Sequence, residues 1–220
     1  MTDEEVVESL ISKSDPVEAV AAYYAWSHEG TRAHVRRAGE ERGVYLEAMS
    51  EWGPVGVVRA TSRSIVPALA DAIPAGRQYV MAPWLLAGAL QAAVRVEDVE
   101  RNCVYWLDRP IASHATVGTA VIRRQGGVVF ADVEDEIAAK CWTLWRSPEF
   151  AELGVATKER FRRHGLARAV LSTMIAGLLE QNLTPLYVVT VTNAASIHLV
   201  ESLGFRKCEA DEFGGYVVKS

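Results

Sequence analysis

Cysteines are few in this chain, and they lie far apart. The 220 residues include only Cys103, Cys141 and Cys208. Their wide separation and odd number exclude a disulfide framework, and no pair has the spacing of metal ligands. We therefore expect three reduced, packed cysteines and no bound metal.

Long apolar runs are also absent. The longest, Met81–Val94, is interrupted by Pro83, Gly88 and Gln91, and it is shorter than the roughly 20 residues that cross a bilayer. The opening residues, MTDEEVVESL, are acidic and lack the apolar segment of a secretory signal. These features predict a cytoplasmic protein that makes no contact with membranes.

Basic residues are not in excess. The chain has 23 Lys and Arg against 28 Asp and Glu, which gives a net charge of −5. A general nucleic-acid binder needs a basic footprint, so we expect no nucleic-acid partner. A mildly acidic chain is compatible with a cationic or amine substrate. The composition, 50% hydrophobic and 23% charged, is that of a globular chain with one large domain or two small ones.

The N-terminal part predicts an α/β lobe over residues 1–108. Residues 3–29 are expected to be helical, with a restart at Asp15-Pro16, and residues 30–43 form a charged connector. A β-β-α-β-α-β order follows, which is typical of an α/β lobe. Its expected elements are strands at 44–49 and 55–60, a helix at 65–73, a strand at 78–82, a helix at 85–94 and a strand at 103–107.

The C-terminal part, residues 109–220, has sharper patterns, and no internal sequence repeat links it to the first. Two apolar rows four residues apart predict a helix at 166–181, and a β-branched run predicts a buried strand at 186–192. Gly204 is a natural end for a short helix at 194–203. The other expected strands are 128–133, 137–145 and 150–157, with a final hairpin of 205–208 and 216–219.

The informative unit is a strand, a basic glycine-containing loop, a helix and a parallel strand. The loop reads RFRRHG at residues 160–165. A helix N-terminus offers unsatisfied N–H groups and a positive dipole end, and Gly165 allows a ligand to approach the backbone closely. This arrangement suits a pyrophosphate, although a solvated basic loop is the commoner outcome. Neither a Walker sequence nor G-x-G-x-x-G is present.

The stretch from about residue 115 to 220 resembles the acyl-CoA-binding core of the GCN5-related N-acetyltransferase (GNAT) superfamily. The family signature, Gln/Arg-x-x-Gly-x-Gly/Ala, is matched by Arg162–Ala167. A strand containing Val155 precedes the signature, Asn193 follows the next strand, and Leu203–Phe205 closes the last helix. The N-terminal lobe is expected to be a degenerate GNAT-like lobe, as in two-lobed relatives such as the glycine N-acyltransferase-like proteins.

The resemblance implies an α/β GNAT acyl-CoA N-acyltransferase fold, a mixed sheet, with an additional N-terminal α/β lobe. It implies an acetyl-CoA-dependent N-acetyltransferase that acts by direct attack of an amine from a small molecule or peptide. Acetyl-CoA is then the co-substrate, no metal is needed, and a homodimer is compatible with the family. The cofactor-binding residues carried over from the family pattern are Leu153, Val155, Thr157, Arg162, Arg163, His164, Gly165, Ala167, Arg168 and Asn193.

One departure from the family concerns catalysis. The family often has a Tyr after the Leu of the last helix as general acid, and Val200 stands there. Ser196 and His198 are nearby candidates for this role, with a packing or surface histidine as the alternative for the latter. Glu152, on the strand that enters the site, is the candidate base, with an exposed edge carboxylate as its alternative.

Two other functions remain compatible with the sequence. One is a CoA-binding or regulatory module with weak catalysis, which the absence of the tyrosine favours. The other is an acyltransferase that takes a longer acyl-CoA or a hydroxyl acceptor.

Overall fold

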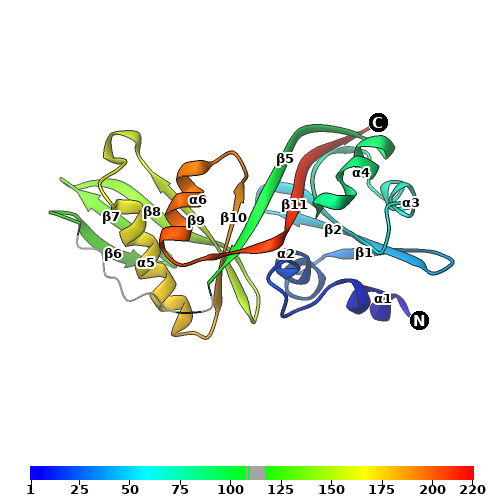
Figure 1. Cartoon of the computed structure of the whole chain (residues 1–220), viewed down its shortest axis with the longest axis horizontal. Helices are drawn as coiled ribbons and strands as arrows, with labels where there is room; N and C mark the ends of the chain where they lie inside the picture. The colour runs from blue at the N-terminus through cyan, green and yellow to red at the C-terminus, as the bar shows by residue number, and fades with distance from the viewer. Residues whose placement is uncertain (108, 110–116) are drawn as a thin grey trace. The chain divides into compact units, whose positions relative to one another are not determined.

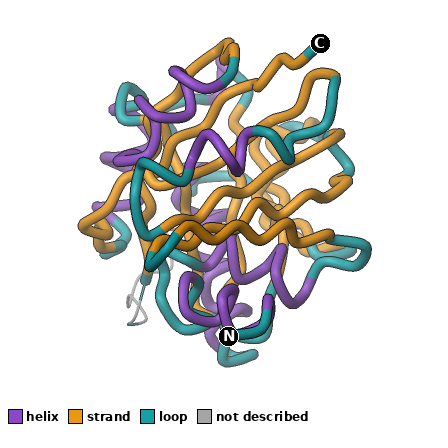
Figure 2. Tube along the Cα trace, turned by 90° about the vertical axis from the view of Figure 1, so that its right-hand side faces the viewer, coloured by secondary structure: helices purple, strands orange, loops and turns teal. Residues whose placement is uncertain are grey.

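The computed structural model describes residues 1–107, 109 and 117–220. It contains two compact units. Unit 1 consists of Met1–Val104 with Cys208–Ser220, and unit 2 of Tyr105–Lys207. Both termini lie in unit 1, at opposite sides of it (Figures 1 and 2). The proposed division into 1–108 and 109–220 differs in placing residues 208–220 with the second part, and Asp108 and Pro110 lie outside the described residues.

Unit 1 begins with short helices rather than one long helical region. Helix α1 (Asp3–Leu10) starts at a capping box, in which the Thr2 and Glu5 side chains each accept a hydrogen bond from the other residue's backbone N–H. After a break, α2 (Ala19–Ala22) continues into the π-helical turn η1 (Tyr23–Ser27). The predicted restart is present as a turn, because Asp15 Oδ1 accepts from Val17 N at 2.9 Å.

The sheet strands of unit 1 lie in the order β1-β2-β3-β4-β11-β5. Helix α3 packs against β1, β2 and α4. Buried side chains from these strands and helices, among them Tyr45, Leu69 and Phe213, form the core. The elements are β1 (Arg32–Ala38), β2 (Glu41–Ser50), β3 (Gly53–Ala60), α3 (Val66–Ala70), β4 (Gly76–Pro83), η2 (Trp84–Leu86), α4 (Ala87–Ala93), β5 (Arg95–Trp106) and β11 (Arg206–Lys219).

The expected connector at 30–43 is wrong, because β1 forms there. Its residues pair antiparallel with β2 from Arg32↔Glu47 to Ala38↔Glu41. β1 lies at one edge of the sheet. Charged side chains commonly protect such edge strands from pairing with another chain. The arginines that indicated a solvated loop therefore belong to a solvated strand edge.

The expected final hairpin is also wrong, because β11 runs unbroken through both of its glycines. Gly214 and Gly215 pair with Met81 and Val80 of β4. A Cβ on Gly214 would overlap the hydroxyl of Tyr79, and one on Gly215 would lie 2.9 Å from Val96 Cγ1. These glycines make room for neighbouring side chains and do not form a turn.

Unit 2 has the strand order β10-β9-β8-β7-β6, and Leu107 N donates to Pro185 O beside β10 at 3.1 Å. Helix α5 packs across β7, β8, β9 and β10, and α6 packs on β10. Edge strand β6 was not expected. The elements are β6 (Val121–Gln125), β7 (Val128–Val133), β8 (Glu136–Arg146), β9 (Phe150–Thr157), η3 (Glu159–Phe161), α5 (Leu166–Leu179), β10 (Thr184–Thr190) and α6 (Ala194–Ser202).

The parallel strands β9 and β10 pair over three residues only. Phe150, Ala151 and Glu152 pair with Thr184, Pro185 and Leu186. β9 then continues to Thr157 and β10 to Thr190 without further pairing to each other. The separation begins immediately after Glu152. It leaves backbone N–H and C=O groups on the facing edges of β9 and β10, and a ligand can pair with these groups.

Unit 1 repeats this architecture. Its strands β3 and β4 are parallel and also pair over three residues, from Val55↔Tyr79 to Val57↔Met81. The order β-β-β-α-β-α-β occurs twice along the chain, from β1 to β5 and from β7 to β11, and the last strand of the second run, β11, belongs to unit 1. The prediction of an α/β fold with an additional N-terminal α/β lobe is confirmed, and the repeat is structural where no sequence repeat was visible.

The close packing at Gly214 gives a test of the β11 assignment. Gly214→Ala should destabilise the protein by about 1–3 kcal/mol, because the added methyl must displace Tyr79 from a packed position. Gly88→Ala is the matched control: nothing lies within 4 Å of the added Cβ in α4, so stability should be unchanged or rise by up to about 1 kcal/mol. Denaturant unfolding of both variants measures this, and equal stabilities would contradict the packing.

Candidate functional site

A cleft of about 840 Å³ lies in unit 2, where β9 and β10 have separated. The end of β9, the loop after it, the first turn of α5 and the beginning of α6 form its walls. The lining residues are Val155, Ala156, Thr157, Phe161, Arg162, Arg163, Gly165, Leu166, Ala167, Arg168, Asn193, Ala195, Ser196, His198 and Leu199.

The N-terminus of α5 is built to receive an anion. Gly165 precedes the helix with φ of 77°, and Arg163 has φ of 66°, so the loop curls tightly before the first turn. N–H groups at the start of a helix have no partner within it. An added Cβ on Gly165 would lie 3.2 Å from Val117 Cγ1, so this position favours glycine for both its conformation and its surroundings.

The arginines of the loop divide into two groups. Arg160 and Lys158 both pair with Glu136, the latter at 2.6 Å, so the first residue of β8 holds them. Arg162 and Arg163 line the cleft, and neither has an ion-pair partner among the described residues. Arg168 is anchored through Ser202, with its Nη1 donating to the Ser202 carbonyl oxygen at 3.2 Å. The positive charge left at the cleft comes from the signature itself.

Three polar side chains complete the walls. Asn193 caps α6, and its Oδ1 accepts from Ser196 N at 3.1 Å, which leaves its Nδ2 as a donor. The Ser196 side chain is hydrogen-bonded to Tyr187. Thr157 Oγ1 is buried in the cleft wall without a hydrogen-bond partner among the described residues. An unpaired buried hydroxyl is costly, so a ligand or water is expected to satisfy it.

Most residues predicted for the cofactor converge on this cleft. Leu153 is buried away from it, and His164 does not line it. Sequence reasoning missed the apolar contributors Phe161, Leu166 and Leu199, although each is next in sequence to a predicted site residue. The predicted residues that line the cleft are Val155, Thr157, Arg162, Arg163, Gly165, Ala167, Arg168 and Asn193.

The three catalytic candidates lie in different surroundings. Ser196 and His198 line the cleft, whereas Glu152 lies on β9 at the last residue paired with β10. Its Oε2 accepts a hydrogen bond from Trp145 Nε1 at 2.6 Å. Burial raises the pKa of the Glu152 carboxyl to about 7, and the hydrogen bond from Trp145 opposes that rise. A carboxyl with this pKa can exchange a proton near neutral pH.

The position at which the GNAT family often has a tyrosine is inaccessible here. Val200 is fully buried, so the side chain there belongs to the packing of α6. Tyr187 on β10 is a buried phenol whose pKa is raised by burial, and it lies near enough to Glu152 and Cys141 for their charges to add to that rise. Of Tyr187 and Ser196, only Ser196 lines the cleft.

Residues 123–212 match the GNAT acetyltransferase family model. This region of the chain is similar to that family. A search of curated proteins gives no match. The match supports an acyltransferase that uses an acyl-CoA and an acceptor.

Solved GNAT structures share the fold across nearly the whole chain. A GNAT-family protein from Novosphingobium aromaticivorans is 22% identical, with a TM-score of 0.60 over 84% of this chain and 91% of that one. A GCN5-related N-acetyltransferase from Sphaerobacter thermophilus is 11% identical, with a TM-score of 0.63 over 100% and 95%. A tandem GNAT protein from the clavulanic acid biosynthesis pathway is 12% identical, with a TM-score of 0.59 over 98% and 96%.

Among the described residues, no three His, Cys, Asp or Glu side chains come together as a metal would require. No helix in the described part of the chain has the length and apolar character of a membrane span.

Proposed function

We propose that this GNAT protein is a cytoplasmic, acetyl-CoA-dependent N-acetyltransferase whose acceptor is an amine of a small molecule or peptide. The observation that carries the proposal is the cleft in unit 2, where separated parallel strands, a glycine-led helix N-terminus and two arginines meet. An anion at the helix end and an extended chain between the strands are the two ligand features such a cleft accommodates.

The residues present fit acetyl-CoA. The N–H groups from Arg163 to Arg168 would hold the pyrophosphate, and the side chains of Arg162 and Arg163 would add charge. The unpaired edge of β9 from Leu153 to Thr157 would pair with the amides of the pantetheine arm, and Asn193 Nδ2 would donate to it. The partnerless hydroxyl of Thr157 lies in this wall, where a polar arm would satisfy it.

The chemistry needs a base and a place for the leaving group. The amine nitrogen forms a bond to the thioester carbonyl carbon, the C–S bond breaks, and the nitrogen loses a proton. We expect Glu152 to accept that proton, directly or through water, because the separation of β9 and β10 begins beside it. The thiolate departs with a proton from Ser196 or His198, which line the cleft, or leaves unassisted.

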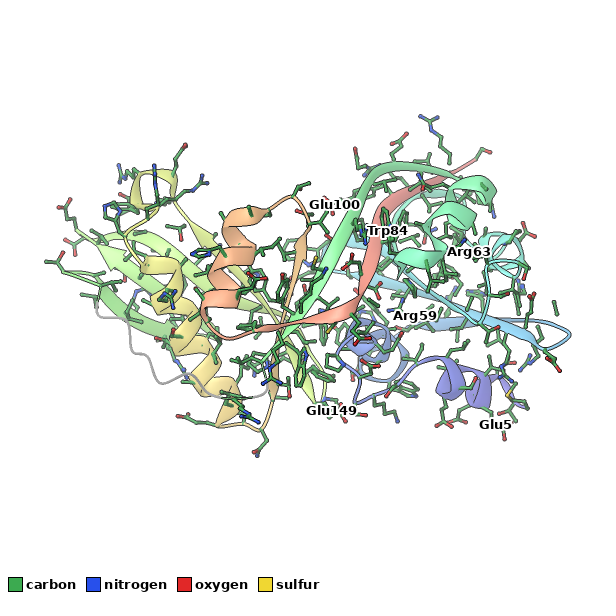
Figure 3. All side chains as sticks on the ribbon, in the orientation of Figure 1. Glu5, Arg59, Arg63, Trp84, Glu100 and Glu149 are labelled. Atoms are coloured by element: carbon green, nitrogen blue, oxygen red, sulfur yellow. The ribbon has the colours of Figure 1, made fainter. Side chains whose placement is uncertain are left out.

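Unit 1 provides no second acyl-CoA site in this proposal. Val57 holds the position in unit 1 that Glu152 holds in unit 2, as the last residue of the parallel pairing. Two residues further on is Arg59, labelled in Figure 3. It is 2% exposed, and its guanidinium contacts Glu18 at 2.5 Å and Glu212 at 2.8 Å. A buried ion cluster thus stands where unit 2 has Gly154.

The loop and helix of unit 1 also differ from those of unit 2. Only Thr61–Ile65 separates β3 from α3, and α3 has five residues against fourteen in α5. So short a helix has only a weak dipole at its N-terminus. The loop before it contains no glycine.

A binding module is the second candidate function, and the buried Val200 favours it. Incubation of the native chain with acetyl-CoA and a panel of amines, followed by thiol release, separates the two. Longer acyl-CoA substrates in the same assay define the acyl preference.

We expect thiol release that depends on the amine, and Glu152→Gln should lower kcat by about 10²–10⁴-fold, because it removes the proton acceptor and keeps the shape. Binding of acetyl-CoA should change little. Full turnover by Glu152→Gln, with loss in Ser196→Ala or His198→Ala, would place the proton route on α6 instead. An absence of turnover with every acceptor would favour the binding module.

Gly165→Glu should abolish the binding of CoA, because it puts a side chain and a negative charge at the pyrophosphate position and strains a residue with φ of 77°. Gly126→Glu is the matched control: it adds the same charge at φ of 56°, in the β6–β7 turn of the same unit, with nothing within 4 Å. Calorimetric titration measures both. Unchanged CoA affinity in Gly165→Glu would contradict the assignment of this loop as the pyrophosphate site.

One equivalent of CoA should bind per chain, because Arg59 and its carboxylates fill unit 1 at the corresponding position. Calorimetry on the native chain gives the stoichiometry, and Gly165→Glu should reduce it to zero. Residual binding of one equivalent in that variant would reveal a site in unit 1.

A further inference from the structure

An extra residue in β8 changes which side chain lies opposite Glu152. Thr143 pairs with Leu153, and the next pair is Trp145 with Glu152, so Leu144 has no partner of its own and forms a β-bulge. Without it, Leu144 would lie opposite Glu152 and Trp145 opposite Ala151. Bulges are common beside active sites, where they redirect a side chain.

The bulge puts two indoles on the face that carries Glu152. Paired residues of neighbouring strands point to the same face, and so do residues two apart on one strand. Trp145 opposite Glu152 and Trp142 opposite Gly154 therefore share a face. Trp142 lies over Gly154, with its Cε2 at 2.7 Å from where a Cβ would be. Among the described side chains, only Trp145 donates to the carboxylate.

The other polar groups around Glu152 are few. Tyr187 on β10 is the neighbouring titratable group. On β8, the Lys140 ammonium lies 5.0 Å from the centroid of the Trp142 ring, and Arg146 donates to Gln181 at 3.2 Å. The Trp145 N–H is consequently the side-chain donor that holds the orientation of Glu152 Oε2.

We propose that Trp145 is a positioning residue for Glu152: the β8 bulge brings its indole N–H to the carboxylate and fixes that carboxylate beside the opening between β9 and β10. This inference rests on the proposed function, in which Glu152 accepts the proton of the amine. The indole N–H accepts no hydrogen bond and does not ionise near neutral pH, so its part is orientation and stabilisation of the ionised carboxylate.

The test uses Trp145→Phe, which removes the N–H and keeps an aromatic ring. Because the lost donor stabilised the ionised carboxylate, the acidic limb of the kcat/KM profile should move upward by about one to two pH units. Trp142→Phe is the matched control, an equal change on the same face, and its acidic limb should stay in place. A lower rate in Trp145→Phe with an unmoved pH profile would reduce Trp145 to a structural residue and overturn the proposal.

A second readout needs no substrate. In ¹H–¹⁵N spectra of the full chain, one of the six tryptophan indole N–H resonances should titrate near neutral pH. That resonance should vanish in Trp145→Phe and should lose its titration in Glu152→Gln. A Trp145 resonance that does not titrate in the native chain, or still titrates in Glu152→Gln, overturns the proposal. A titrating resonance in a chain that acylates no acceptor keeps the contact and overturns the acyltransferase function instead.

Discussion

The parting of β9 and β10 after three paired residues is the constraint on which the rest of unit 2 depends. A parallel pair that stops early leaves N–H and C=O groups without strand partners, and such groups need a ligand or water. Because α5 connects β9 to β10, its N-terminus lies at the end of β9 where the two strands have separated. The anion-binding turn and the strand edge thus arise from one topological feature.

Local patterns predicted the elements that build this feature, because their signals lie in continuous sequence. The apolar rows of α5, the β-branched run of β10 and the signature before α5 are each read within one segment. Edge strands β1 and β6 were missed, since their arginines resemble a solvated loop when no pairing partner is known. β11 was divided in the prediction because the need for Gly214 and Gly215 comes from Tyr79 and Val96 on other strands.

The same difference between signals within one segment and contacts between strands applies to the site. Eight of the ten expected cofactor residues line the cleft, because most belong to one loop and one strand end. The surroundings of Glu152 were not predictable in this way. Its contact with Trp145 depends on a bulge at Leu144, and a bulge is a property of two strands in register rather than of either sequence.

The two units show how one architecture can keep or lose a ligand site through a few positions. At the end of its parallel pairing, unit 2 has Glu152 followed by Gly154, and unit 1 has Val57 followed by Arg59. Glycine leaves space that Trp142 covers on one face, whereas arginine extends into the interior and requires Glu18 and Glu212 as partners. A buried arginine with two carboxylates costs desolvation that only good geometry offsets, and in unit 1 this cluster links β3, the start of α2 and β11. The strand separation that we propose as a binding edge in unit 2 is thereby used in unit 1 to hold its own elements together.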